Sequence, residues 1–310
     1  MLARVGVISL NTYREAVRAR VLHGLFALAL GTGGYALIVG QFALRDTLRV
    51  VSDLGSASIS LYAIVVAIVL GATSLYRELE LKTIFPILAR PLRRSEYLVG
   101  KYLGTLLTLT VFVFANAGAL LLALSKLAGG GLGAGLAVGP GSVLVFLGAA
   151  WKLPRARTYL PIPWALALFA GGFWLSANAP DDRRVIVGAA LLTLCEVSIV
   201  AALATLFASF SSPFLTAVFT LGLFLVGRSA DTLGHLPPRV FGNTIKSIGG
   251  VLSVVVPNLM LYVPPRPLLT GESATTPLLT YIGWASLHAL GWTAGLLALA
   301  SLIFRRRDFL

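Results

Sequence analysis

Charged residues and cysteine are scarce in this chain of 310 residues. Only 12% of the residues are charged while 57% are hydrophobic, and the mean hydropathy is +0.88. An ordinary soluble domain is about 45–50% apolar, so this composition excludes that class and indicates an integral membrane protein. The single cysteine, Cys195, lies inside an apolar run, so one chain can build neither a disulfide nor a cysteine metal site.

Catalytic signatures are also missing from the sequence. Gly100–Lys101–Tyr102 lacks both the upstream glycine and the hydroxyl residue of a phosphate-binding loop, so the chain is not expected to hydrolyse ATP by itself. The three histidines, His23, His235 and His288, are scattered, and no His-Glu-x-x-His or Gly-x-Ser-x-Gly occurs. We therefore expect neither an enzyme nor a metal or cofactor site.

The excess of positive charge has a different meaning here than in a soluble protein. The net charge is +13, but the cations stand at the ends of apolar runs, where they set orientation and meet anionic lipid. We therefore expect these cations to contact the lipid bilayer, and we expect no nucleic acid as a partner. The first 20 residues hold four arginines and no apolar core of about 7–15 residues, so no removable signal peptide is expected.

Apolar runs divide the chain into membrane spans. Residues 1–21 place Leu10, Tyr13 and Val17 on one side, which predicts an amphipathic elbow helix at the membrane surface; the other interpretation is a plain cytosolic start of the first span. A span of about 20 residues crosses a 30 Å hydrocarbon core. Spans are predicted at residues 22–44, 57–75, 102–125, 185–207, 214–226 and 280–304.

The segment 126–184 can be interpreted in two ways. A glycine-rich breaker precedes two apolar runs, residues 134–151 and 160–176, which flank three cations without an acid, Lys152, Arg155 and Arg157. If both runs cross the bilayer, the cations are cytosolic, as positive clusters tend to be, and the chain has eight spans. If neither crosses, the segment is an extracytoplasmic insertion. The extra hairpin is favoured, and either alternative leaves the downstream orientation unchanged.

The orientation follows from the distribution of cations. The inner segments hold 16 of the 25 Lys and Arg residues, which places both termini on the cytosolic side. Residues 228–279 form the largest outer loop, and residues 248–263 within it are apolar but interrupted by Gly249, Gly250 and Pro257. This pattern predicts a re-entrant or interfacial segment rather than a span.

One acid lies within a span. Glu196 is near the middle of residues 185–207, where a carboxylate costs about 2.5–3.5 kcal/mol on insertion scales. It could line a substrate path or form a hydrogen bond between helices, with Asn116 or His288 as partner. A protonated glutamic acid with a purely structural role is the alternative, and the sequence does not decide between them.

The longest strongly charged segment, residues 76–101, lies between two spans. It resembles the loop between the second and third membrane helices of ABC-2-type permeases, the membrane subunits of ABC exporters. The matching residues are Arg77, Glu78, Glu80, Thr83, Arg90, Pro91, Arg94, Glu96, Tyr97, Gly100 and Lys101. The elbow helix, the turn at 206–213 and the end of the chain at 304–309 resemble the same family.

The resemblance implies a single permease domain over residues 1–310, with an all-α, six-helix core and an elbow helix, here extended by the extra hairpin. It further implies two copies or two related subunits, and a separate ABC ATP-binding subunit that holds ATP and Mg²⁺. The expected location is the bacterial cytoplasmic (inner) membrane. The residues implied in contact with the ATPase are Arg77, Glu78, Glu80, Lys82, Thr83, Arg90 and Arg94. Pro86 departs from the pattern, because it must end or kink a helix that begins at Glu78.

Two other functions compete with that of an exporter permease. A membrane scaffold could recruit a cytosolic partner through its basic loops without moving a substrate. A channel or ion-coupled carrier would need charges along several spans, and only Glu196 meets that condition.

Overall fold

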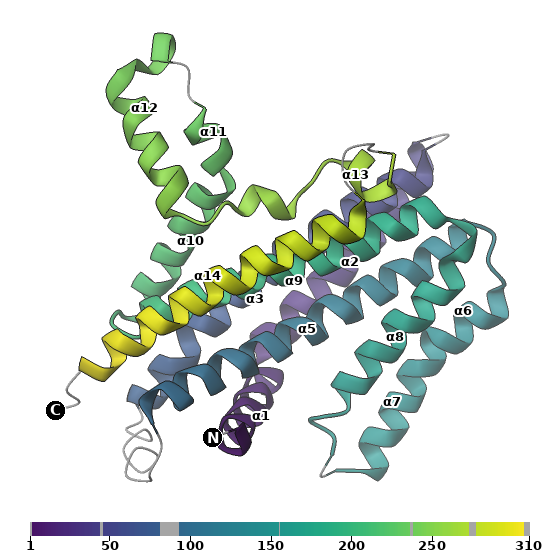
Figure 1. The fold of residues 1–310 in the computed structure, drawn as a ribbon. Coiled ribbons are helices and arrows are strands. Elements are labelled where there is room, and N and C mark those ends of the chain that lie inside the picture. Colours follow the sequence, from purple (N-terminus) through teal and green to yellow (C-terminus); the bar gives the residue numbers. More distant parts are fainter. Residues whose placement is uncertain are drawn as a thin grey trace.

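A computed structural model describes residues 2–43, 46–80, 93–154, 156–235, 238–272 and 277–306 of the chain. Every regular element in these residues is a helix (Figure 1). The structure therefore confirms the all-α class.

Five helices are long and apolar enough to cross a membrane: α2 (Arg20–Phe42), α3 (Thr47–Glu80), α5 (Arg94–Leu127), α9 (Pro180–Ala208) and α14 (Leu278–Arg306). The next apolar helix, α10 (Pro213–Arg228), has 16 residues. At 1.5 Å per residue it measures about 24 Å, less than the hydrocarbon core of about 30 Å. The expected span at 214–226 is therefore a short helix that ends inside the bundle.

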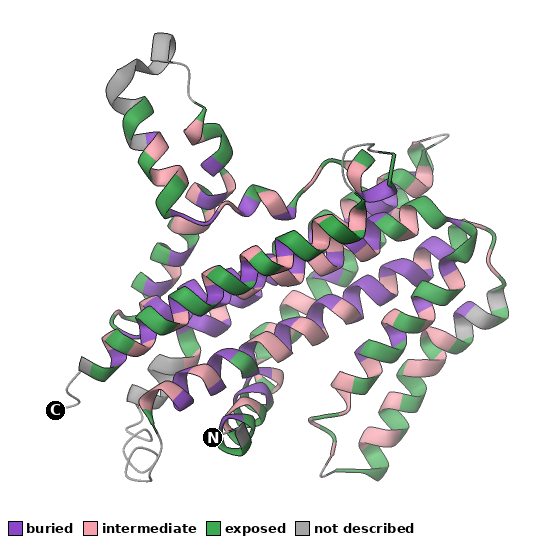
Figure 2. Cartoon of the chain, viewed as in Figure 1, coloured by how far each residue is buried: buried purple, intermediate pink, exposed green. Residues whose placement is uncertain are grey.

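Helix α9 forms the centre of the bundle, between α3, α5 and α14 (Figure 1). Residues 199–206 are buried on every side of the helix, and Figure 2 shows purple segments of α9 behind α14. A helix that is apolar all round belongs in a core. Helix α3 packs tightly against it at Gly71, where an added Cβ would lie 2.3 Å from Cβ of Ala204.

The amphipathic start of the chain is a separate helix, α1 (Leu2–Arg18), which ends where Ala19 adopts an extended conformation. Its buried face holds Val5, Thr12, Tyr13 and Ala16, whereas Leu10 is exposed. The face of α1 that packs on α5 is thus rotated relative to the apolar stripe predicted through Leu10, Tyr13 and Val17. The reason lies in α5, because Gly100 and Gly104 leave space there for the backbone of α1.

The glycine-rich insertion is a helical hairpin alongside α5. Helices α6 (Leu132–Val138) and α7 (Pro140–Lys152) run down, and α8 (Pro161–Leu175) with the short η1 (Ser176–Asn178) runs back up to α9. Gly118 of α5 and Gly172 of α8 allow these two helices to touch backbone to backbone, since a Cβ on Gly172 would lie 2.8 Å from the Gly118 carbonyl oxygen.

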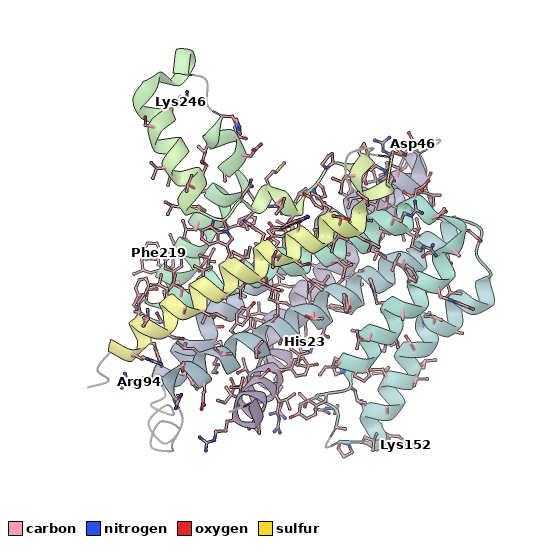
Figure 3. All side chains as sticks on the ribbon, viewed as in Figure 1. His23, Asp46, Arg94, Lys152, Phe219 and Lys246 are labelled. Atoms are coloured by element: carbon pink, nitrogen blue, oxygen red, sulfur yellow. The ribbon has the colours of Figure 1, made fainter. Side chains whose placement is uncertain are left out.

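The lower turn of this hairpin reaches the elbow helix. Tyr159, in the turn between α7 and α8, stacks on Tyr13 of α1 with 6.4 Å between ring centroids. In Figure 3 Lys152 and Arg94 lie toward one end of the molecule, and Asp46 and Lys246 lie at the other. This arrangement favours the interpretation in which the hairpin crosses the bilayer.

The long outer segment divides into four short helices. Helices α11 (Ala230–Gly234) and α12 (Pro238–Val255) stand away from the bundle (Figure 1), and η2 (Leu259–Tyr262) and α13 (Arg266–Thr270) return to it. The apolar residues 248–263 are therefore the end of α12, a break at Pro257, and η2, whose Leu259 and Tyr262 are buried. A re-entrant position in the membrane stays a prediction.

Helix extends beyond the apolar runs in two polar segments. Helix α3 already begins at Thr47, ahead of the apolar run 57–75, and at the segment 76–101 it continues to Glu80, while α5 begins at Arg94. Hydropathy marks only the part of a helix inside the hydrocarbon, and backbone hydrogen bonding continues into the headgroup region.

The eight-span topology can be tested with single cysteines at two exposed positions, Asp46 and Lys152. In a Cys195→Ala background, we expect an impermeant thiol reagent to label the Asp46→Cys variant on intact cells. The Lys152→Cys variant should react only after permeabilisation, because positive clusters favour the cytosolic side. Labelling of the Lys152→Cys variant on intact cells would remove the hairpin from the membrane and leave six spans.

Candidate functional site

A buried ion pair joins two helices in the middle of the bundle. The Arg228 guanidinium donates from Nε to Oε1 of Glu196 at 2.7 Å and from Nη2 to Oε2 at 2.9 Å. The Glu196 side chain is 0% exposed and that of Arg228 is 25% exposed. This two-point geometry is the strong form of an arginine–carboxylate pair.

Chain topology explains why these two residues meet. Helices α9 and α10 are antiparallel and joined by the short turn after Ala208. Glu196 lies about 18 Å before the end of α9, and Arg228 about 22 Å after the start of α10, at 1.5 Å per residue. The last residue of α10 therefore lies at nearly the depth of Glu196, and its cation neutralises the acid.

Helix α3 contributes the third member of this cluster. Ser60 Oγ lies 3.5 Å from Oε2 of Glu196 and 3.5 Å from Nη2 of Arg228. Phe224, one turn before Arg228, has its ring 5.5 Å from the guanidinium carbon. The polar cluster is therefore shared by α3, α9 and α10.

A cavity of about 290 Å³ extends from this cluster toward the outer end. Its α3 wall carries Asp53, Ser56 and Ser60, which lie on one helical face, and the Ser56 hydroxyl is buried without a hydrogen-bond partner. Helix α9 and the segment from η2 to α13 form the other walls, with Val185, Ala189, Thr193, Tyr262, Val263, Pro264, Arg266 and Leu269. We call the cavity and the Glu196–Arg228–Ser60 cluster the polar column.

An arginine closes the outer end of the polar column. Arg266 of α13 forms ion pairs with Asp53 of α3 and Asp182 of α9, and it donates to Ser52 Oγ at 3.1 Å. Ser52 in turn donates to Asp182 at 2.8 Å. Three elements distant in sequence are thus held together above the cavity.

The polar column offers hydrogen-bonding and ionic groups. These are hydroxyls, the carboxylates of Asp53 and Glu196, and the guanidinium groups of Arg228 and Arg266, which pair with those carboxylates. In the described ranges no cluster of three His, Cys, Asp or Glu residues could hold a metal ion. The arrangement provides polar contacts at membrane depth without a nucleophile beside a general base.

The prediction of Asn116 or His288 as the hydrogen-bond partner of Glu196 was wrong, because Arg228 binds the Glu196 carboxylate. Asn116 donates from Nδ2 to the Phe112 carbonyl at 2.8 Å, and its buried Oδ1 has no partner. It lines a separate cavity of about 180 Å³ between α2, α3 and α5. The structure therefore does not bring Asn116 together with Glu196.

His288 belongs to a third group, on α14. Trp292 Nε1 donates to His288 Nε2 at 3.1 Å, and His288 Nδ1 lies 2.8 Å from the Tyr262 hydroxyl. An indole nitrogen can only donate, so Nε2 accepts and the neutral ring donates from Nδ1 to Tyr262. This network explains Trp292 in mid-span and joins α14 to η2.

The sequence-predicted coupling residues are only partly described. Arg77, Glu78 and Glu80 form the last turn of α3, whereas Lys82, Thr83 and Arg90 lie outside the described residues. Arg94 donates to the carbonyls of Phe304 at 3.2 Å and Arg305 at 2.9 Å. Arg94 thus ties the start of α5 to the end of α14, whose last carbonyls lack helical partners.

A second buried cation lies close to the coupling segment. The Lys101 side chain is 5% exposed; its ammonium lies 3.5 Å from Glu15 of α1 and donates to the Ser74 carbonyl of α3 at 3.4 Å. Lys101 therefore connects the elbow helix, α5 and the lower part of α3. On the elbow helix, burial raises the pKa of the Tyr13 hydroxyl above its usual range.

Sequence reasoning missed Arg228, Ser60 and Arg266 as site residues. Arg228 and Arg266 were counted with the outer cations, since each follows an apolar run. One signal could have pointed to Arg228: the preceding run, residues 214–226, is short for a span, so its terminal cation must lie inside the bundle.

The fold and the site define a multi-pass membrane protein with a polar cavity between its helices. Residues 7–309 match the family model of the ABC-2 family transporter protein. The chain belongs to this family, whose members are the permease components of transporters and are not themselves catalytic. No curated protein matches the chain.

Proposed function

We propose that this chain is the permease subunit of an ATP-driven exporter that moves its substrate along the polar column. A separate ABC ATP-binding subunit, which holds ATP and Mg²⁺, would attach beneath it, and a second copy or a related permease would complete the transporter. The proposed location is a bacterial cytoplasmic membrane with both termini in the cytosol.

The continuity of α3 carries this proposal. The helix has 34 residues, a length of about 51 Å, which exceeds a hydrocarbon core of about 30 Å. One face of its upper part lines the polar column through Asp53, Ser56 and Ser60, and its last turn carries Glu78 and Glu80. A rigid helix would transmit a displacement at Glu80 to Ser60, about 30 Å away.

The lower part of α3 is held by a defined joint. Lys101 contacts the Ser74 carbonyl and Glu15, so the elbow helix and α5 constrain α3 just before its last turn. The extension of helix to Glu80 agrees with a short lever that continues the second span. The remainder of that lever, from residue 81 to Pro86, lies outside the described residues.

The test combines co-purification with a charge reversal. The tagged full chain should recover an ATPase with a phosphate-binding loop from the cells that produce it. The Glu80→Arg variant should remain in the membrane. The amount of ATPase that co-purifies with it and its rate of ATP-driven transport should both fall at least tenfold, because a reversed charge repels its docking partner. Lys82→Ala is the matched control and should be much milder.

Two outcomes would contradict the proposal. Recovery of no ATPase would leave a membrane scaffold as the better interpretation. Normal ATPase recovery and transport in Glu80→Arg, together with a defect in Lys82→Ala, would show that the segment acts only as a cationic anchor at the membrane surface.

A further inference from the structure

A third cavity, with an apolar lining, lies between α5, α2 and the α6–α8 hairpin. Its volume is about 390 Å³, and its walls come from α2, α5 and the α6–α8 hairpin. The lining residues are Phe26, Leu30, Leu37, Ala115, Ala119, Leu122, Ala123, Lys126, Gly135, Gly139, Pro140, Val143, Trp164 and Leu168. We call this cavity the hairpin groove.

The hairpin groove exists because α8 packs closely on α5 whereas α7 does not. Helix α8 packs closely on α5 at Gly118 and Gly172, while α7 has no buried residue. The helix interruption at Gly139 and Pro140 separates α6 from α7 at the groove wall. Opposite, Ala119 and Ala123 are too small to fill the space between α5 and α2.

The length of the hairpin groove matches one leaflet of a bilayer. Its wall on α5 runs from Ala115 to Lys126, about 16 Å at 1.5 Å per residue, and half of a 30 Å hydrocarbon core is about 15 Å. Lys126 lies at the end of α5 remote from Arg94, so the groove occupies the outer half of the membrane in the proposed topology.

One cation stands at the mouth of this apolar space. Lys126 is the single charged residue in the lining, it is exposed, and no acidic residue among the described ones forms an ion pair with it. A Cβ on Gly135 would lie 3.2 Å from its Cε, so the aliphatic stem covers the groove and the ammonium extends to the interface. The polar atom of Trp164 is already bonded to Ser142.

We propose that the hairpin groove binds an anionic phospholipid of the outer leaflet, with one acyl chain along α5 and the headgroup phosphate on Lys126. The apolar walls fit a hydrocarbon chain, the length fits one leaflet, and the cation complements the phosphate. This site is separate from the polar column. The proposal rests on the topology given in the proposed function, but not on transport or on the ATPase.

Trp164 provides a probe inside the hairpin groove. The full chain is reconstituted in bilayers that contain acyl-brominated phosphatidylglycerol or acyl-brominated phosphatidylcholine, and the fluorescence lost in Trp164→Phe is taken as the Trp164 signal. One cation near the membrane surface contributes about 1 kcal/mol toward an anionic lipid, which corresponds to about fivefold. We expect bromine quenching of Trp164 to show about that preference for the anionic lipid.

Matched variants separate a built site from ordinary lipid contact. Lys126→Gln should lower the ratio of quenching by the anionic lipid to quenching by phosphatidylcholine to about one. Lys152→Gln should leave this ratio unchanged, because Lys152 lies at the end of α7 that is remote from the groove. Ala123→Phe should fill the groove and reduce quenching by both lipids. Should Lys126→Gln fail to fold, the unmodified chain at about 1 M salt, where the screening length is about 3 Å, should lose the preference instead.

The proposal fails if both lipids quench Trp164 of the unmodified chain equally. It also fails if the preference survives in Lys126→Gln and at high salt, or if Ala123→Phe leaves the quenching unaltered.

Discussion

Replacement of Arg228 by methionine is expected to destabilise the bundle by about 3–5 kcal/mol, the usual cost of removing one partner from a buried ion pair. Glu196 is 0% exposed, and Ser60, 3.5 Å away, would be its remaining polar contact. A carboxylate in that position must take up a proton or draw water into the bundle. The measurement is the midpoint of thermal unfolding of the purified chain in detergent, followed by size-exclusion chromatography.

The double variant Glu196→Leu/Arg228→Met provides the control for this prediction. Apolar residues of similar volume often replace a buried pair without loss of stability, so the double variant should recover most of the stability lost in Arg228→Met. The difference from additivity measures the interaction energy of the pair. Two independent, additive losses would show that the two side chains do not depend on each other in the folded chain.

The same double variant separates structure from transport. If the polar column conducts the substrate, the recovered protein should fold and retain its ATPase, yet transport at least tenfold less, because the polar contacts at mid-depth are gone. Normal transport by a stable double variant would leave the pair with a structural role alone.

The second large effect is expected at the contact of the elbow helix with α5. A Cβ on Gly104 would lie 2.4 Å from the Ser9 carbonyl oxygen and 2.5 Å from Thr12 Cβ. Because one of these atoms belongs to the backbone, α1 cannot yield without moving as a whole. Gly104→Leu should therefore cost about 3 kcal/mol, the upper part of the range for overpacked cores, and displace α1 from α5.

Gly24→Leu on α2 is the matched control for Gly104→Leu. An added Cβ there meets no atom within 4 Å, and leucine favours a helix over glycine by up to about 1 kcal/mol. We expect its unfolding midpoint to be unchanged or slightly raised. Equal midpoints for Gly104→Leu and Gly24→Leu would contradict the close packing of α1 on α5.

Displacement of α1 should also reach the coupling segment. Lys101 holds Glu15 of α1 and the Ser74 carbonyl of α3 at the same joint. In the proposed function, Gly104→Leu protein that remains folded should therefore show weaker coupling between ATP hydrolysis and transport, whereas Gly24→Leu should not.

Sequence alone determined the membrane class, the all-α fold and the family. The reason is that a bilayer imposes a local requirement: each span must supply about 20 apolar residues in one run. The charged motif from Arg77 to Lys101 is likewise contiguous, so its resemblance to ABC-2 permeases could be recognised without coordinates, and the family match confirmed it. Helix ends were less predictable, because hydropathy reports the hydrocarbon depth and not the extent of hydrogen bonding.

Only the tertiary structure decided which residues meet. Ser60, Glu196 and Arg228 are far apart in the chain, and their contact depends on α10 ending at mid-depth beside α9. The packing side of α1 was decided by Gly100 and Gly104 on another helix, which no periodicity within residues 1–21 can show. Long-range pairing of this kind depends on side-chain fit between helices, whereas the span pattern depends only on each segment's own transfer to the membrane.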